Sequence, residues 1–413
     1  MPSNPRITII GLHFPPETTG NAPYTGSLAR GLLAKDLSTL VITGHPHYPE
    51  WVIRTGYGAW VRRELVDGVH VTRLRHYVPS KPNAVRRLLS EVSFGIRVLF
   101  ESWGRPDVVV LVSPALFATA IAVLRARLSP SRPAVVVWVQ DLYSLGVTEI
   151  GAGGRSVAAI MTWVEAMTLR AASKVVVIHE RFAIYARESL GVEAQRIQVV
   201  RNWTHLASAP DRDVAAVRSG FGWDADETVV LHAGNMGAKQ GLENVIAAAR
   251  LCDDANLPIR FVLLGDGNQR EHLELIGSGV KRLQFIDPVA DSDFQAVLAS
   301  ADILLINEKP GVSGMSVPSK LTSYFDSGRA VVAATGPDGI TAAELQAADG
   351  GFVVESGDPG ALVTVCLNLR EHPEKAEAFG NNGRQFRRDV LGEERAIAGF
   401  ANMLEDVATK KAR

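Results

Sequence analysis

The sequence predicts an α/β protein made of two doubly wound parallel-sheet domains, and three observations support this prediction. The chain has 413 residues, which is longer than a single hydrophobic core usually grows. Short runs of Val, Ile and Leu alternate with amphipathic stretches of helical length, as in parallel sheets that helices cover on both faces. This alternation is interrupted once, by the polar and turn-rich stretch 204–228, and then resumes.

The first series of elements begins with an apolar strand at 6–11, a loop rich in proline and glycine, and a helix that starts near residue 24. One long helix is expected around 85–103 and another at 115–124. Further strands are expected at 37–44, 68–75, 107–112, 134–141, 173–180 and 197–202.

The second series supplies another complete sheet. Strands are expected at 228–234, 259–267, 282–287, 302–307 and 329–335, and helices at 242–251, 294–301 and 320–328. The domain boundaries that follow are 1–205 for the N-terminal lobe and 206–390 for the C-terminal lobe. A final helical stretch, 391–413, is expected to pack back towards the N-terminal lobe.

Composition excludes several classes of protein. Hydrophobic residues make up 46% and charged residues 21%, which are values of a globular chain. Two cysteines form no disulfide framework or Cys/His array, which fits a reducing compartment. The first apolar run is too short for a signal peptide, and the apolar stretch 108–124 is interrupted by Ser113 and Pro114. A cytoplasmic protein is therefore expected, and 108–124 is expected to be a strand followed by a helix.

Charge is distributed unevenly along the chain. Residues 1–203 contain 23 Lys and Arg against 14 Asp and Glu, so their net charge is +9, although the whole chain carries only −1. Within this half, the segment 83–103 predicts a helix with basic residues beside one apolar face. That face could bind an anionic membrane or could simply pack on the sheet. Its expected members are Val85, Leu88, Leu89, Val92, Ile96, Leu99 and Phe100.

Two candidate anion sites lie in the C-terminal half. The first is the glycine-rich turn between Gly234 and Gly241, where backbone amides, a helix start and Lys239 could hold a diphosphate. The second is a long loop that ends at Ser319 and Lys320, immediately before the next helix. A bare strand–helix turn with a solvated lysine would also explain the first pattern, which matches neither a dinucleotide fingerprint nor a P-loop.

Five motifs occur in order along nearly the whole chain: FPPETTGNAPYTGSLA, PHYPEW, GNMGAKQGLE, LLGDG and VPSKLTSYFDSGRAVVAA. Together they resemble the retaining GT-B glycosyltransferases of family 4, of the colanic-acid and O-antigen type. The resemblance implies two Rossmann-like lobes that face a central cleft. It also implies that the N-terminal lobe binds the acceptor and the C-terminal lobe binds a nucleotide sugar.

The resemblance also implies roles for individual residues. The nucleotide sugar would contact Gly20, Gly234, Asn235, Lys239, Gly241, Gly265, Asp266, Gly267, Ile286, Ser319, Lys320 and Ser323. Two features depart from the family pattern: the cations of the glycine-rich turn, and an E-x7-E motif whose positions hold Met315 and Ser323. Many relatives have Arg where Asn235 stands and Lys where Gln240 stands, and Ser323 replaces the Glu that binds ribose hydroxyls. The reaction class survives these changes, but the nucleotide stays open.

The reacting centre is expected at Asp141, which ends the strand 134–141, where similar enzymes carry a catalytic His or Asp. Its carboxylate could stabilise positive charge on the anomeric carbon, or it could cap the following helix. His13 could touch the sugar or be structural. The loop residues His47, Tyr48 and Trp51 are expected to bind the acceptor, although core packing of the aromatic rings is a comparable alternative.

No cofactor and no essential metal are expected. The histidines of the loop 45–51 lack ligand spacing, and the DxD strings at 224–226 and 291–293 fall in a linker and at a helix start. The predicted function is that of a retaining glycosyltransferase, of the hexosyltransferase class. It would move a sugar from a nucleotide diphosphate sugar to a lipid-linked or other polysaccharide precursor, with a lipid-linked acceptor expected at the inner membrane face and no nucleic-acid partner. A nucleotide-sugar epimerase or hydrolase, or a non-catalytic nucleotide-sugar-binding protein, is the alternative.

Overall fold

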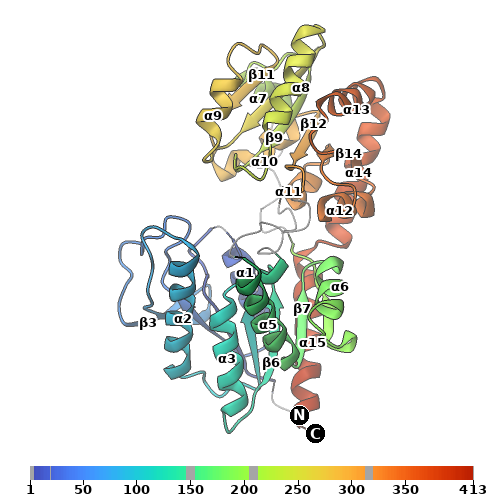
Figure 1. The fold of residues 1–413 in the computed structure, drawn as a ribbon. Coiled ribbons are helices and arrows are strands. Elements are labelled where there is room, and N and C mark those ends of the chain that lie inside the picture. Colours follow the sequence, from blue (N-terminus) through green and yellow to red (C-terminus); the bar gives the residue numbers. More distant parts are fainter. Residues whose placement is uncertain (1–3, 19, 146–153, 204–212, 312–319, 413) are drawn as a thin grey trace. The chain divides into compact units, whose positions relative to one another are not determined.

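A computed structural model describes residues 4–18, 20–145, 154–203, 213–311 and 320–412 (Figure 1). The chain divides into two compact units, which we call unit 1 (Met1–His205 with Glu393–Arg413) and unit 2 (Leu206–Gly392). Each unit has its own largely parallel sheet covered by helices, so the predicted α/β class with two parallel-sheet lobes is confirmed.

Among the described residues, unit 1 has an eight-stranded sheet in the order β3-β4-β2-β1-β5-β6-β7-β8. Its strands are β1 (Ile7–Gly11), β2 (Thr39–Gly44), β3 (Val61–Val66), β4 (Val69–Leu74), β5 (Val108–Val112), β6 (Ala134–Val139), β7 (Lys174–Val177) and β8 (Ile197–Val199). All neighbours are parallel except β3, which pairs antiparallel with β4. The sequence analysis missed β3 because this edge strand is only half-buried and carries three charged residues, Arg62, Arg63 and Glu64.

The helices of unit 1 are α1 (Ala22–Ala34), α2 (Ala84–Phe100), α3 (Leu116–Leu128), α5 (Gly154–Ala171), α6 (Glu180–Glu188) and α15 (Glu393–Ala412). The segment 108–124 forms β5 and most of α3, as expected, and no helix among the described residues is long and apolar enough to cross a membrane. Helices α2, α3 and α5 lie side by side (Figure 1). Helix α15 packs against α1, and its Phe400 contacts the buried ring of Trp138 at 4.9 Å between centroids.

Unit 2 has a six-stranded, fully parallel sheet in the order β11-β10-β9-β12-β13-β14 among its described residues. The strands are β9 (Thr228–Ala233), β10 (Ile259–Leu264), β11 (Leu283–Ile286), β12 (Ile303–Asn307), β13 (Ala330–Ala334) and β14 (Gly351–Val354). The helices are α7 (Val214–Gly220), α8 (Glu243–Asp254), α9 (Arg270–Ile276), α10 (Asp291–Ser300), α11 (Lys320–Ser327), α12 (Ile340–Ala348), α13 (Pro359–Glu371) and α14 (Pro373–Asp389).

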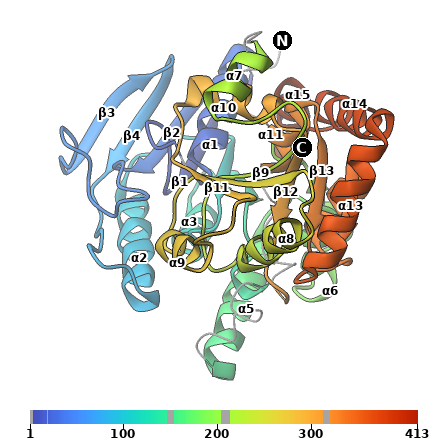
Figure 2. The same ribbon diagram turned by 90° about the horizontal axis from the view of Figure 1, so that it is seen from above.

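Two hydrophobic cores flank this sheet. Side chains that point to one face pack under α8 and α13, which lie side by side (Figure 2). Side chains that point to the other face pack with Tyr324 and Phe325 of α11. Burial on both faces explains why β9, β10, β12 and β13 are nearly continuous apolar runs, which is the signal that predicted them.

Candidate active site

The order in which successive strands are added to the sheet of unit 2 reverses at β9. From β9 the chain moves outward to β10 and β11, and then it returns to the other side of β9 with β12. Open α/β sheets bind ligands beyond the carboxyl ends of their strands at such a switch point. The loops that follow β9, β10 and β12 meet here. The Gly234 amide donates to the carbonyl of Leu264 at 2.8 Å, and the Met236 amide donates to the carbonyl of Asp266 at 2.8 Å.

Two predicted glycines are required by close approaches at this point. A Cβ on Gly265 would lie 2.1 Å from the carbonyl oxygen of Gly234, which no side chain can tolerate. A Cβ on Gly234, whose φ is 122°, would lie 2.9 Å from Cε of Lys320. Because Gly234 has no side chain, the Lys320 stem can lie directly against the Gly234 turn. Of the second predicted anion site, Lys320 is thus brought to the first, while Ser319 lies outside the described residues.

A buried histidine holds the Lys320 amine. Nζ of Lys320 lies 2.9 Å from Nε2 of His232, and Nδ1 of His232 lies 3.2 Å from the carbonyl oxygen of Leu305. The carbonyl can only accept, so Nδ1 carries the proton and Nε2 accepts from Lys320. Burial lowers the pKa of Lys320 to about 7, although the carboxylate of Glu308 opposes this shift. Burial and the neighbouring Lys320 hold the pKa of His232 well below its usual range.

Asn307, the last residue of β12, holds the end of the glycine-rich turn. Its Nδ2 atom donates to the carbonyls of Gln240 at 2.7 Å and Gly241 at 2.9 Å, and its Oδ1 accepts from Asn244 at 2.9 Å. Sequence reasoning missed both Asn307 and His232. The available signal was a polar residue within or at the end of an otherwise apolar strand, since such a residue must find a specific partner when it is buried.

The remaining predicted residues of unit 2 surround this centre. Asn235 and Lys239 are exposed on the turn, and the carbonyl of Ile286 accepts from the Gly265 amide at 3.0 Å. Ser323 is buried in α11, one turn after Lys320. Ser319 lies outside the described residues. A hollow of about 600 Å³ beside the turn is lined by Asp266, Gly267, Asn268, Arg270, Glu271, Glu274, Asp287 and Pro288.

In unit 1, Asp141 lies two residues beyond β6 and is exposed. The amides of the next helical residues, Tyr143 and Ser144, donate to the carboxylate of Glu165 at 2.8 and 3.1 Å. Glu165 therefore caps these amides. Contact between Asp141 and a ligand stays a prediction.

Glu17, which sequence reasoning overlooked, organises the predicted acceptor loop. Its Oε1 atom accepts from the backbone amides of His47 at 2.7 Å and Tyr48 at 2.9 Å, while Oε2 lies 2.8 Å from Nδ1 of His13. Burial raises the pKa of Glu17, but the hydrogen bond and charge of His13 and the two amides outweigh it, so the pKa is lowered overall. Glu17 is thus a buried carboxylate that joins the loops after β1 and β2.

The aromatic residues of this loop differ in accessibility. His47 is buried, whereas Tyr48 and Trp51 are partly exposed and have ring centroids 6.1 Å apart. A Cβ on Gly20 would lie 3.9 Å from Cε1 of Tyr48, so the predicted glycine of the first loop is beside the second loop. Of the three predicted acceptor residues, Tyr48 and Trp51 are therefore the two that a ligand can reach.

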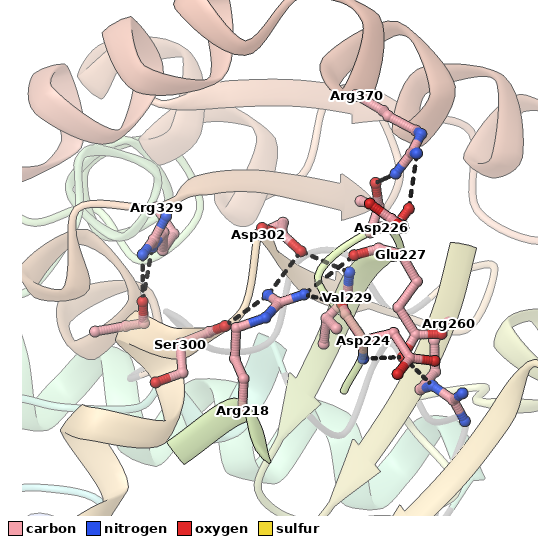
Figure 3. A network of polar contacts seen from close by, with 12 residues as sticks. Arg218, Asp224, Asp226, Glu227, Val229, Arg260, Ser300, Asp302, Arg329 and Arg370 are labelled. Carbon is pink, nitrogen blue, oxygen red and sulfur yellow. Dashed lines mark hydrogen bonds and ion pairs between the residues drawn. The ribbon is translucent and has the colours of Figure 1, made fainter. Parts of the chain in front are cut away.

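A polar network at the opposite end of the sheet of unit 2 contacts the backbone of one DxD string (Figure 3). Arg218 donates to the carbonyls of Asp224 at 2.9 Å and Glu227 at 3.1 Å, and Arg370 donates to the carbonyl of Asp226 at 2.7 Å. These contacts give the stretch 224–227 a structural role before β9. The second string, 291–293, opens α10.

Comparison with known protein families identifies the class of enzyme to which this chain belongs. Residues 19–203 match the model of a glycosyl transferase 4-like domain, and residues 227–372 match the model of glycosyl transferases group 1. The chain therefore belongs to family 4 of the GT-B glycosyltransferases, enzymes that use nucleotide sugars. The alternatives without sugar transfer are not supported by this membership.

One curated relative and two solved structures are similar to this chain along most of its length. The chain is 33% identical over 346 residues to the putative colanic acid biosynthesis glycosyl transferase WcaI of Escherichia coli, covering 80% of this chain and 83% of the relative. Sucrose-phosphate synthase from Thermosynechococcus elongatus has the same fold, with a TM-score of 0.76 at 16% identity over 98% of this chain and all of the other. HepE from Anabaena, solved in complex with UDP, aligns with a TM-score of 0.72 at 16% identity over 97% and 100% of the two chains.

Proposed function

We propose that this glycosyltransferase moves a sugar, with retention of configuration, from a nucleoside diphosphate sugar to a lipid-linked polysaccharide precursor. The position of Lys320 against the Gly234 turn is the observation that supports binding of the nucleoside diphosphate sugar. A buried cation beside a glycine-rich turn and a helix N-terminus is suited to an anionic group such as a diphosphate.

In this proposal the diphosphate lies between the turn 234–241 and the N-terminus of α11. Lys320 neutralises its charge, and Asn235, Lys239 and Gly241 contribute from the turn. The nucleoside occupies the hollow beside Gly265, Asp266, Gly267 and Ile286. Ser323 lies too deep in α11 to replace a ribose-binding carboxylate directly, so the ribose is held mainly by the turn residues.

The chemical step needs little covalent participation by the protein. As the bond from the anomeric carbon to the phosphate lengthens, positive charge grows on that carbon and negative charge grows on the leaving phosphate. Lys320 stabilises the phosphate, which takes the proton of the attacking hydroxyl. Asp141 stabilises the positive charge or binds hydroxyls of the transferred sugar, and Gly20 allows the first loop to approach the phosphates.

The acceptor half of the proposal is supported by an apolar surface on unit 1. The predicted apolar side of α2 is largely exposed, because the helix instead buries Phe94, Gly95 and Val98. The helices α3 and α5, which lie beside α2, also carry exposed apolar side chains. This membrane face consists of Val85, Leu89, Ile96, Leu99, Phe100, Leu124, Leu128, Val157, Ile160, Trp163 and Met167, which are between 37% and 80% exposed.

Basic residues lie on the same helices. Arg86, Arg87 and Arg127 are exposed, and these arginines contribute to the positive net charge of residues 1–203. The guanidinium of Arg87 also lies 5.3 Å from the ring centre of Trp51, so the acceptor loop borders the membrane face. Apolar side chains flanked by arginines fit the interface of an anionic bilayer, where a lipid-linked acceptor would be presented. The polysaccharide named for the Escherichia coli relative supports the same class of acceptor.

An assay of sugar transfer to lipid tests the proposed function. Purified protein is incubated with radiolabelled nucleotide sugars and with a lipid extract that contains undecaprenyl-linked saccharides, and the organic phase is counted. We expect label to enter the lipid fraction with the parent and to be lost with Lys320→Ala. Release of free labelled sugar without any lipid product would contradict the transferase proposal in favour of hydrolysis.

A further inference from the structure

Four histidines gather around Glu17 at the carboxyl ends of β1, β2 and β4. His13 follows β1, His45 and His47 follow β2, and His76 follows β4. The ring centroids of His13 and His47 are 5.3 Å apart, and those of His47 and His76 are 5.1 Å apart. The sequence alone predicted no metal site, since the loop histidines lack ligand spacing by themselves. The fold adds His13 and Glu17 from a different loop.

Donor atoms of three of these residues lie close together. One ring nitrogen of His13, one ring nitrogen of His47 and one carboxylate oxygen of Glu17 all lie within 4.8 Å of one another. Nitrogen and oxygen ligands of a tetrahedral Zn²⁺ lie about 2.0–2.2 Å from the ion, so small side-chain movements would let one ion contact all three atoms.

The surroundings already satisfy the other atoms of these groups. Oε1 of Glu17 accepts two backbone amides, which leaves Oε2 for a ligand or for His13. Nδ1 of His47 lies 3.6 Å from Oε1 of Glu17 and 2.8 Å from the carbonyl oxygen of His45, to which it donates, so Nε2 keeps its lone pair. This Nε2 is buried and has no hydrogen-bond partner among the described residues. A backbone carbonyl that fixes the second ring nitrogen is the usual arrangement around a metal-binding histidine.

We propose that His13, Glu17 and His47 bind one divalent transition-metal ion of the Zn²⁺ type. Two imidazoles and one carboxylate form the donor set of sites that keep a coordination position open, here for water or a substrate oxygen. The ion would replace the proton between His13 and Glu17 and would join the loops after β1 and β2. This inference goes beyond the proposed function, because no step of the sugar transfer described above uses a metal.

The test is metal binding by the full chain, prepared without a histidine tag and stripped with a chelator. Co²⁺ is titrated while its visible absorption is recorded, and bound Zn²⁺ is then counted by mass spectrometry after dialysis. We expect about one equivalent of either ion per chain, with a Co²⁺ spectrum that Zn²⁺ abolishes. Binding should also raise the thermal midpoint, because the ion binds only the folded site.

Two variants decide whether these residues are the ligands. His13→Gln keeps a hydrogen-bond donor for Glu17 but removes the imidazole, so the fold is expected to persist while metal affinity falls at least roughly tenfold. His70→Gln changes an exposed histidine of β4 outside the cluster and should bind like the parent. The proposal is overturned if the parent binds no ion above background, or if His13→Gln binds as tightly as the parent with the same spectrum.

Discussion

Nζ of Lys320 lies 2.9 Å from Nε2 of the buried His232, so the cation proposed to bind the donor donates a hydrogen bond to a neutral imidazole. His232 has its other nitrogen on the carbonyl of Leu305 and can only accept from the lysine. This arrangement directs the amine towards the Gly234 turn without neutralising it. Within the part of the chain that the structure describes, the lysine has no directly bonded anion for a donor phosphate to displace, and Glu308 acts on it only through its longer-range charge.

The first prediction concerns the pH dependence of donor binding. Because burial lowers the pKa of Lys320 to about 7, the donor-free lysine is charged below that pH and becomes neutral as the pH rises through it. The diphosphate of a nucleotide sugar needs the charged form, so binding above pH 7 must take up a proton. The Kd should rise by up to about tenfold per pH unit above this pKa. Calorimetry in two buffers of different ionisation enthalpy measures the proton uptake directly.

Lys320→Arg provides the matched control, because a guanidinium stays charged across this range. Its donor affinity should be almost independent of pH between 7 and about 9. An equally flat profile for the parent would mean that Lys320 does not lose its proton in this range.

The second prediction is that Asp141→Asn lowers turnover more than it lowers donor affinity. The amide keeps the shape of the side chain but removes the negative charge that would stabilise the transition state. We expect kcat to fall on the order of ten- to a hundredfold, with a much smaller change in donor Kd. Steady-state kinetics and calorimetry separate the two quantities. An unchanged kcat combined with a lower melting temperature would instead assign Asp141 to capping the helix that follows.

The third prediction concerns Glu91, which is buried in α2 and accepts hydrogen bonds from the hydroxyl of Tyr143 and, at 3.2 Å, from the amide of Phe117. Burial raises its pKa from 4.5 to about 7, against the effect of these hydrogen bonds. Its contribution to stability is therefore fully present below pH 4.5 and is lost as the pH rises through 7. Such a shift corresponds to about 3 kcal/mol.

Glu91→Gln cannot ionise, so its melting temperature relative to the parent should rise between pH 5 and 8. The loss of the Phe117 contact would move the whole curve without changing this slope. Differential scanning calorimetry over the pH series measures it. Parallel curves for parent and variant would show that Glu91 does not ionise with a raised pKa.

The fourth prediction is that unit 1 binds anionic bilayers through the membrane face. Arg86→Glu/Arg87→Glu should weaken cosedimentation with anionic liposomes at least roughly tenfold, since each basic residue near the surface contributes about 1 kcal/mol. Binding of the parent should disappear with neutral lipid and weaken as salt shortens the Debye length below about 10 Å. Arg181→Glu/Arg187→Glu on α6 makes the same charge change away from this face and should bind nearly normally. Protein that remains in the supernatant with anionic liposomes at low salt would refute the membrane face.

Features that show in a short stretch of sequence could be predicted, and features that depend on contacts between distant parts of the chain could not. Strands such as β9 and β12 are predictable because burial on both faces makes each a short apolar run, whereas the charged edge strand β3 lacks that local signal. Lys320 and the glycines are visible as local motifs. The roles of His232 and Glu17 are not, because His232 contacts Lys320 and Glu17 contacts the amide of His47, which are distant in the chain, and only the folded sheet brings these groups together.

The central claim is that Lys320 holds the donor diphosphate, and a single binding measurement tests it most directly. A thermal-shift panel of uridine, guanosine and adenosine diphosphate sugars first selects the donor. Calorimetry then compares the parent with Lys320→Ala and with Lys281→Ala, which removes an exposed lysine elsewhere in unit 2. Loss of one charge-assisted contact, about 1.5–3 kcal/mol, predicts roughly ten- to 150-fold weaker binding by Lys320→Ala and unchanged binding by Lys281→Ala. Donor binding by Lys320→Ala that is as tight as that of the parent would contradict the account.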